Sequence, residues 1–173
     1  PILDESWKLS LGTAIACDAL SNATHIETDG AFLMGLLHDT GTPVLVNAVA
    51  EHERQNKGLA LGPDVVGILI SQLHEEIGAH VLADWGMPAS VVGAAGAHHR
   101  YRAGAKSTPA CSLVFAANLI CQHLGIGSVQ REINFPLEHV FAELKLADSE
   151  RITPILETVS QQLENLLSGM NGN

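Results

Sequence analysis

The chain has 173 residues, a length typical of one domain that can bury a core without help from metal ions or disulfides. Its nine basic and nineteen acidic residues give a net charge of −10 at pH 7, which makes nucleic acid an unlikely partner, because contacts to a phosphate backbone need positive charge. The hydrophobic fraction of 46% is typical of a globular protein. No apolar run reaches the length of about 18 residues that is needed to cross a bilayer. We therefore expect one soluble domain over residues 1–173 with no membrane partner.

The first part of the chain is predicted to form three helices. Residues 4–22 are rich in small side chains, which permit close packing against other helices. The apolar run 31–37 is followed by His38 and Asp39 and then by a glycine, so a buried helix is expected to carry two polar side chains at its C-terminal end. A third helix is expected over about residues 42–55, because proline is tolerated in the first turn of a helix.

The segment 64–84 carries the strongest helical pattern in the chain. Six apolar residues recur at the spacing of one helical face and are expected to be buried, namely Val66, Leu69, Ile70, Leu73, Ile77 and Val81. His74 belongs to the same face, so it is expected to point inward or along the margin of the core. Taken alone, it is better explained as a core histidine bonded to backbone than as a ligand.

Two further helices are expected in the middle of the chain. One begins at Pro88 and ends at the doublet His98-His99, whose side chains are either metal ligands or groups that suit the negative end of a helix dipole. The other spans about residues 108–124 and is strongly apolar. Asn118 lies within it, and an amide in such surroundings is expected to have a hydrogen-bond partner.

The last part of the chain is predicted to form a short helix over 136–146 and a longer helix that begins at Ser149 or at 153–154. The apolar stripe of the longer helix is expected to pack on the rest of the domain, and consists of Ile155, Leu156, Val159, Leu163, Leu166 and Leu167. Residues 168–173 are expected to fray. Because no alternating strand pattern occurs, we expect an all-α fold of about seven or eight helices, with the helix over 31–37 near the centre and fully surrounded by the others.

The cysteines indicate the compartment in which the chain works. Cys17, Cys111 and Cys121 are odd in number, lie among apolar residues and lack CxxC spacing, so they are expected to be buried thiols in a reducing compartment. No targeting segment is visible in the sequence, and a cytoplasmic location is expected by default.

Polar motifs interrupt these apolar helices in a recognisable order. A neutral imidazole and a carboxylate side by side can share a divalent metal, or can hydrogen-bond to each other and to nearby backbone. The order WKLS, GLLHDTG, LHEEIG followed by WGMP, AHHR and AANLI resembles the HDOD domain, a signalling branch of the HD-type metal-dependent phosphohydrolases. The resemblance covers Trp7 to about Leu124 and implies an HD-domain-like helical bundle from bacterial signal transduction.

The resemblance further implies that several helices normally precede the segment that matches Trp7. The chain begins at Pro1 without a methionine, so it is expected to be a shortened segment that lacks those helices. Part of the core face is then expected to be exposed, as an apolar patch that favours self-association. The other partners implied are signalling domains or proteins.

The resemblance implies a metal site that is only partly retained. Its candidate ligands, considered vestigial, are His38, Asp39, His74, His98 and His99. Active HD phosphohydrolases add a histidine on the first helix and a late aspartate, but this chain has Leu9 and Asn118 at those positions. The related cyclic-dinucleotide phosphodiesterases have a lysine after the HDxG turn, where Thr42 stands here, and a DGxGYP run, where this chain reads RYRAGAKS.

These replacements decide between the candidate functions. An amide is a far poorer ligand than a carboxylate for a hard divalent metal, and hydrolysis needs a metal to activate water and to neutralise phosphate charge. We therefore expect a non-enzymatic regulatory or output domain of signal transduction with no resident cofactor. The alternative is a residual metal-dependent phosphohydrolase or cyclic-dinucleotide phosphodiesterase that uses the retained residues, and a sensor that binds metal or nucleotide without turnover is a third hypothesis.

Overall fold

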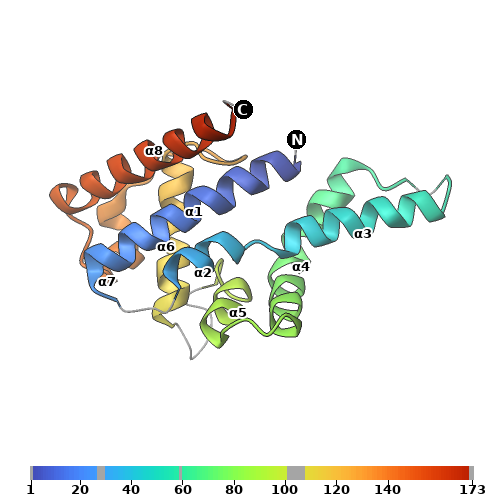
Figure 1. Cartoon of the computed structure of the whole chain (residues 1–173), viewed down its shortest axis with the longest axis horizontal. Helices are drawn as coiled ribbons and strands as arrows, with labels where there is room; N and C mark the ends of the chain where they lie inside the picture. Colours follow the sequence, from blue (N-terminus) through green and yellow to red (C-terminus); the bar gives the residue numbers. More distant parts are fainter. Residues whose placement is uncertain (1, 27–29, 59, 101–107, 172–173) are drawn as a thin grey trace.

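Figure 1 shows a computed structural model of the chain, which describes residues 2–26, 30–58, 60–100 and 108–171. These residues form eight α-helices and one short 3-10 helix, and they contain no strand. The elements are α1 (Ile2–Thr24), α2 (Ala31–Leu37), α3 (Gly41–Gln55), α4 (Pro63–Asp84), α5 (Ala89–Ala95), α6 (Pro109–His123), η1 (Phe135–Leu137), α7 (His139–Glu143) and α8 (Ser149–Asn171). The prediction of an all-α fold with about seven or eight helices is confirmed.

The core lies where α1 crosses α6, with α8 alongside α1 (Figure 1). Almost every residue of α6 from Ala110 to Cys121 is buried, so this helix is enclosed on all sides. The middle of α1 is buried as well, and its small residues, among them Ala14 and Ala16, let neighbouring helices approach closely. All three cysteines are free and buried, as the sequence predicts.

Helix α2 lies near the centre but is not fully surrounded, so that part of the prediction is wrong. It packs on α1, α5 and α6, yet the side chain of Phe32 is 41% exposed. The contact with α1 is unusually close, because a Cβ atom at Gly35 would lie 2.5 Å from the carbonyl oxygen of Thr13. A two-turn helix held this tightly against one neighbour leaves its opposite side open to solvent.

Helices α3 and α4 pack against each other, and α3 extends away from the body (Figure 1). Only the first two residues of α3, Gly41 and Thr42, are buried. The apolar stripe of α4 is half-buried throughout, whereas its buried residues are His74, Glu75, Gly78 and Leu82. The stripe was expected in the core, but the helices that pack on α4 are chiefly α3 and α5, and together they cover it incompletely.

The C-terminal elements differ from the prediction at their boundaries. The single helix expected over 136–146 is divided into η1 and α7, and the chain turns at Lys145, whose φ of 58° ends the helical conformation. Helix α8 begins at Ser149 and continues to Asn171, beyond the expected start of fraying at residue 168. Residues 172–173 lie outside the described part of the chain.

The apolar stripe of α8 packs on the domain as predicted, largely against α1. Ile155, Val159 and Leu163 are buried, whereas Leu166, near the C-terminal end, is 45% exposed. The buried part of the stripe therefore ends before the helix does. From residue 164 onward the described side chains of α8 are mostly exposed, so this end of the helix contributes little to the core.

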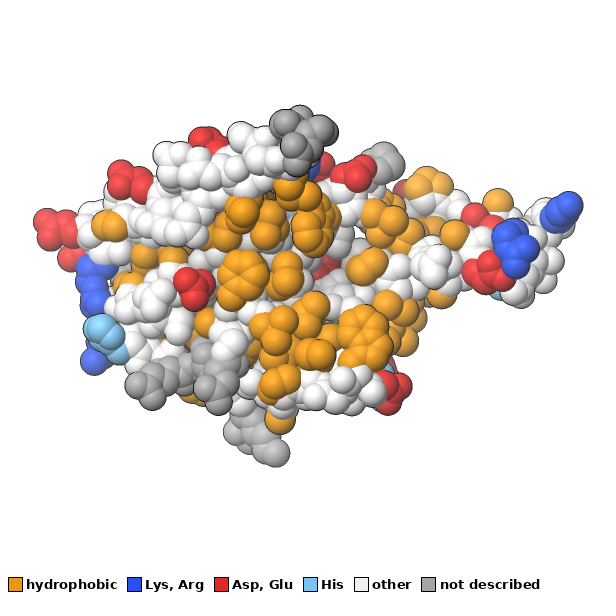
Figure 2. All heavy atoms as spheres, in the orientation of Figure 1, with side chains coloured by type: hydrophobic (Ala, Val, Ile, Leu, Met, Phe, Trp, Pro, Cys, Tyr) orange, Lys and Arg blue, Asp and Glu red, His pale blue; other side chains and the backbone are white. Residues whose placement is uncertain are grey.

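Several large hydrophobic side chains of α1 and α2 are exposed. Ile2, Leu3, Trp7 and Phe32 are each between 41% and 50% exposed. Figure 2 shows hydrophobic side chains gathered over the middle of the face on which α1 and α2 lie. The expected apolar patch is thus present, while its attribution to missing helices stays a prediction. Among the described residues, no helix combines the length and apolar character that a membrane span requires.

Candidate functional site

The His38-Asp39 pair lies in the turn between α2 and α3. His38 directly follows the last residue of α2 and is 1% exposed. Gly41 then begins α3 against the backbone of α4, where a Cβ atom would overlap the carbonyl oxygen of His74. Gly41 of the HDTG motif therefore holds the turn against α4. This contact brings the turn next to His74, which lies 33 residues further along the chain.

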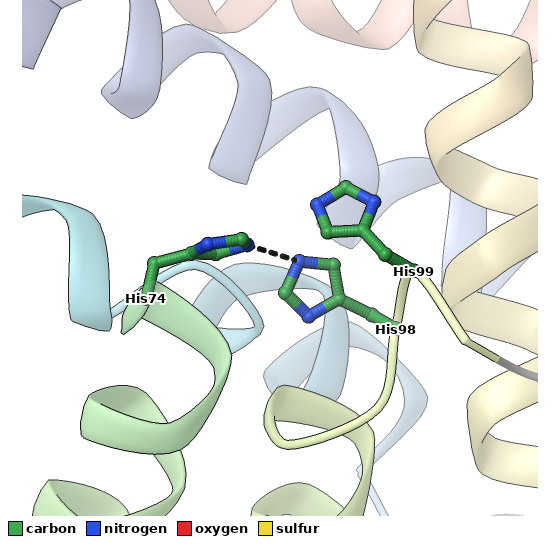
Figure 3. Close-up of side chains that lie close together, drawn as sticks. All are labelled: His74, His98 and His99. Carbon is green, nitrogen blue, oxygen red and sulfur yellow. Dashed lines mark hydrogen bonds between the residues drawn. The ribbon is translucent and has the colours of Figure 1, made fainter. Parts of the chain in front are cut away.

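The histidines of the second and third motifs meet beside this turn (Figure 3). His74 lies on α4, and His98 and His99 lie just after the C-terminal end of α5. One ring nitrogen from each of the three histidines can be chosen so that all three atoms lie within 4.8 Å of one another. The ring of His38 packs edge-on against the ring of His98, with the ring centroids 4.8 Å apart. The five predicted residues are thus in one region, and three of them form the tightest group.

Backbone carbonyls fix the tautomers of three of these histidines. The Nδ1 atoms of His38, His74 and His98 lie 2.7, 2.7 and 3.0 Å from the carbonyl oxygens of the preceding helical turn. A carbonyl oxygen can only accept, so each Nδ1 must carry the hydrogen and each Nε2 must present a lone pair. Nevertheless, the Nε2 atoms of His74 and His98 face each other at 3.3 Å. Two facing lone pairs need a proton or a cation between them.

Burial makes a proton a poor candidate for this position. The pKa of His98 is held well below its usual value, first by removal of the ring from water and then by the neighbouring histidines. Burial also lowers the pKa of His38, although the nearby Asp39 carboxylate favours the protonated form. The pKa of His99 is lowered as well, first by desolvation and then by His74. Burial therefore favours the neutral form of His38, His98 and His99.

Hydroxyl groups hold the Asp39 carboxylate. Its Oδ1 accepts a hydrogen bond from Thr42 Oγ1 at 2.6 Å, and its Oδ2 accepts one from Ser6 Oγ at 3.3 Å. The resemblance implies a lysine at the position of Thr42 in the related phosphodiesterases, and Thr42 is a neutral donor instead. Ser6 of α1 and Thr42 of α3 therefore orient the carboxylate, and neither hydroxyl group neutralises its charge.

The separation between the Nε2 atoms of His74 and His98 fits two ligands of a borderline transition metal. In a tetrahedral site with metal–nitrogen bonds of about 2.0–2.1 Å, two ligand nitrogens are about 3.3–3.4 Å apart, and the His74 and His98 Nε2 atoms are separated by 3.3 Å. Imidazole ligands suit zinc, iron, copper or nickel more than magnesium or calcium. His74, His98 and His99 are the residues that would hold such an ion. Asp39 and His38 lie beside this group rather than within it.

Leu9 and Asn118, the two positions predicted to have lost metal ligands, belong to the same cavity. A cavity of about 550 Å³ is lined by His38, Asp39, His74, His98 and His99 and also by Leu9 and Asn118, and we call it the histidine pocket. Leu9 reaches it from α1 and Asn118 from α6. Both residues therefore lie in the same cavity as the histidines, and their assignment to lost ligand positions stays a prediction.

Asn118 was predicted to have a hydrogen-bond partner, and the structure shows one for its side-chain oxygen but none for its side-chain nitrogen among the described residues. Its side-chain Oδ1 accepts from Thr13 Oγ1 at 3.2 Å, as expected for a buried amide. Its Nδ2 has no hydrogen-bond partner among the described residues, although Asn118 is only 5% exposed. The amide nitrogen is therefore a buried donor without a partner among the described residues.

Comparison with known proteins places the chain in a family. The sequence model of the HDOD domain matches residues 1–101, more than half of the chain. The chain belongs to the HDOD domain family. No curated protein matches this HDOD domain.

A solved structure shows the same fold. It is a protein from Marinobacter aquaeolei that is named for signal transduction, with a TM-score of 0.70 and 18% sequence identity to this HDOD domain. The match covers 94% of this chain and 38% of the other, so this HDOD domain spans well under half of that protein. At this identity the likeness supports the fold, which is shared along almost the whole chain.

Glu75 is a site residue that sequence reasoning missed. Its Oε1 accepts from the backbone N–H of His99 at 2.9 Å, and its Oε2 accepts from Arg100 Nε at 2.9 Å. It therefore fixes the turn that presents the histidine doublet. A signal was available in the LHEEIG motif, where an acidic residue directly follows His74 and precedes the buried Gly78 by one helical turn.

Truncation of Glu75 is expected to loosen this turn. In Glu75→Ala the backbone N–H of His99 loses its charged acceptor, and a hydrogen bond to a charged group contributes about 1.5–3 kcal/mol. The ion pair adds little because the guanidinium of Arg100 is 60% exposed. We expect urea unfolding to show a loss of about 2 kcal/mol. The matched variant Glu76→Ala, at the exposed neighbouring position, should stay within about 0.5 kcal/mol of the parent. Equal stability of the two variants would contradict the assigned role.

Proposed function

We propose that this HDOD domain is a non-enzymatic regulatory domain of signal transduction, with a degenerate HD-type metal site. The observation that carries the proposal is the presence of Leu9 and Asn118 in the wall of the histidine pocket. A side chain without any ligand atom and a neutral amide stand where two ligands would complete the site. What remains is three imidazoles in a tight group with one carboxylate beside them.

The remaining carboxylates do not compensate for these losses. Asp39 supplies one carboxylate beside the histidines, and Glu5, which also lines the pocket, pairs with Lys8 at 3.3 Å. Phosphoester hydrolysis needs a metal that both activates water and neutralises charge on the phosphate. A site poor in anionic ligands holds hard divalent ions weakly. This composition supports a regulatory role rather than turnover.

In this proposal the domain acts through contacts with other signalling domains or proteins in a bacterial cytoplasm. The exposed apolar residues of α1 and α2, including Trp7 and Phe32, supply a surface for such contacts or for self-association. The net charge of −10 disfavours nucleic acid as the partner. The Marinobacter aquaeolei protein, named for signal transduction, is consistent with this class of function.

One observation favours a second candidate function, a residual metal-dependent phosphohydrolase or cyclic-dinucleotide phosphodiesterase. The facing Nε2 atoms of His74 and His98 have the separation expected for ligands of one tetrahedral metal ion. A bound ion would supply Lewis acidity there. Asp39 would then be the residue that orients water or accepts its proton.

Turnover measurements separate the two candidates. The purified protein is analysed for metal, then assayed for release of phosphate and for cleavage of cyclic dinucleotides with added manganese or iron. We expect no rate above that of Asp39→Ala under the same conditions. A metal-dependent rate that Asp39→Ala abolishes would establish the second candidate and overturn the first.

A further inference from the structure

The histidine pocket has the size and lining of a small-molecule site. Its volume of about 550 Å³ falls within the range of about 300–1,000 Å³ that ligand pockets occupy. Its apolar lining comes from three parts of the chain and includes Leu9 of α1, Ile70 of α4 and Ile126 after α6. The cavity therefore combines these apolar side chains with a polar part. We call this polar part, formed by His74, His98 and Asp39, the floor of the pocket.

The floor of the pocket is rich in hydrogen-bond acceptors. His74 and His98 present Nε2 lone pairs, because their Nδ1 atoms are bonded to backbone carbonyls. Asp39 presents a carboxylate, which can accept about four hydrogen bonds and receives two from Thr42 and Ser6. A ligand that donates several hydrogen bonds therefore complements this floor better than one that only accepts.

The charge of the lining also favours a ligand that donates hydrogen bonds. Among the described residues that line the pocket, the acids are Glu5 and Asp39, and none is a lysine or an arginine. Phosphate recognition in proteins usually relies on arginine or lysine, or on helix N-termini. A phosphate ester would here face the Asp39 carboxylate without a protein cation to balance it. The lining instead favours a positively charged head group.

A buried donor completes the pattern. Asn118 lines the pocket and is 5% exposed, and its Nδ2 atom is buried without an acceptor among the described residues. A buried amide that lacks a partner is costly, so its natural complement is an oxygen atom on a ligand. This requirement is independent of the charge of the floor.

We infer that the histidine pocket binds a small organic ammonium compound with an apolar body and an oxygen acceptor. The ammonium group donates to Asp39 and to the Nε2 atoms of His74 and His98, the oxygen accepts from Asn118 Nδ2, and the apolar body lies against Leu9 and Ile70. This inference rests on the proposed regulatory function, because it makes the pocket an input site rather than a catalytic one. A bound ligand would contact α1, α4 and α6 together, because Leu9, Ile70 and Asn118 all line the pocket.

A matched set of probes tests this inference by calorimetry, in buffer with a chelator to remove metal ions. Phenylalaninol carries all three features, 3-phenylpropan-1-ol lacks the ammonium group, and phenyl phosphate replaces it with an anion. We expect phenylalaninol to bind at least tenfold more tightly than either of the others. Equal binding of phenylalaninol and phenylpropanol, or tighter binding of phenyl phosphate, would overturn the inference.

Variants of the pocket distinguish specific binding from general attraction to an acidic protein. Asp39→Asn is expected to weaken phenylalaninol binding at least tenfold, and Leu9→Trp, which fills the pocket from α1, is expected to abolish it. Asp84→Asn removes the same charge from an exposed position outside the pocket and should leave binding unchanged. Equal weakening by Asp84→Asn and Asp39→Asn would show attraction to net charge alone and reject the site.

The outcomes for this inference and for the proposed function are separable. Absence of phenylalaninol binding together with absence of turnover would reject the ligand class and leave the regulatory role intact. Binding of phenyl phosphate that appears only with added manganese would reject the inference and support the second candidate function. Binding of phenylalaninol that Leu9→Trp abolishes, with no turnover of phosphate esters, is the expected result.

Discussion

Replacing Leu9 by histidine and Asn118 by aspartate in one variant is expected to raise the affinity for manganese at least about 100-fold, equivalent to about 2.8 kcal/mol. Both residues line the pocket that also holds His38, Asp39 and His74. The variant adds one imidazole and one carboxylate to a cage whose other ligands are already oriented by backbone hydrogen bonds, so little reorganisation opposes binding. Titration with manganese, followed by calorimetry, measures the gain.

Each single substitution should give less than the double variant, because the carboxylate contributes charge and the histidine contributes coordination. The double variant Leu137→His with Asn165→Asp is a matched control, since it introduces the same groups at exposed positions outside the pocket. It should bind manganese no better than the parent. If the pocket variant also binds manganese no better than the parent, positions 9 and 118 do not converge on the metal and their assignment from the motif order is wrong.

The same variant is expected to be less stable than the parent when metal is removed. Aspartate at position 118 places a carboxylate at a site that is 5% exposed, which costs a few kcal/mol unless it is neutralised or paired. Manganese at about 100 times its dissociation constant should restore about 2.7 kcal/mol, because it binds only the folded state. Thermal melting with manganese and with a chelator measures both effects.

Much of the fold was predictable because helical periodicity and end signals are local properties of the sequence. Helices α3, α4 and α6 begin and end within one or two residues of the prediction, where proline or a capping threonine marks the start. Burial was less predictable because it depends on which helices are neighbours. The stripe on α4 is only half-buried, and Phe32 on α2 is 41% exposed, and neither result follows from spacing alone.

The candidate site was predictable in its members but not in its internal geometry. The motif order identified the histidines and the replaced positions, which the structure brings to one pocket. Whether they act as vestigial metal ligands stays a prediction. Local sequence could not show that His74 and His98 face each other through Nε2, because this depends on backbone carbonyls that orient each ring. Glu75 was missed because its partners, His99 and Arg100, lie 24 and 25 residues away.

The substitution Gly41→Ala is expected to destabilise the domain by at least about 3 kcal/mol, the upper end of the cost of overpacking. A methyl group at this position overlaps the carbonyl oxygen of His74 and lies 2.8 Å from its Cα atom, so relief requires the backbones of α3 and α4 to separate. Rotation of a side chain cannot remove the overlap. For a domain of this size, such a loss lowers the melting temperature by about 6–12 °C. Urea unfolding and thermal melting of metal-free protein measure it.

Gly93→Ala is the matched control, because a Cβ atom at this position of α5 meets nothing within 4 Å. An interior helical glycine replaced by alanine gains about 0.5–1 kcal/mol from reduced chain entropy and better helix propensity. The two variants should therefore move stability in opposite directions although each adds one methyl group. Separation of α3 from α4 also carries the turn with Asp39 away from His74, so nitrogen NMR should show altered ring signals for His74 in Gly41→Ala alone. Unchanged stability and unchanged ring signals in Gly41→Ala would show that the HDTG turn does not pack on α4 in this way, and that the pocket is assembled differently.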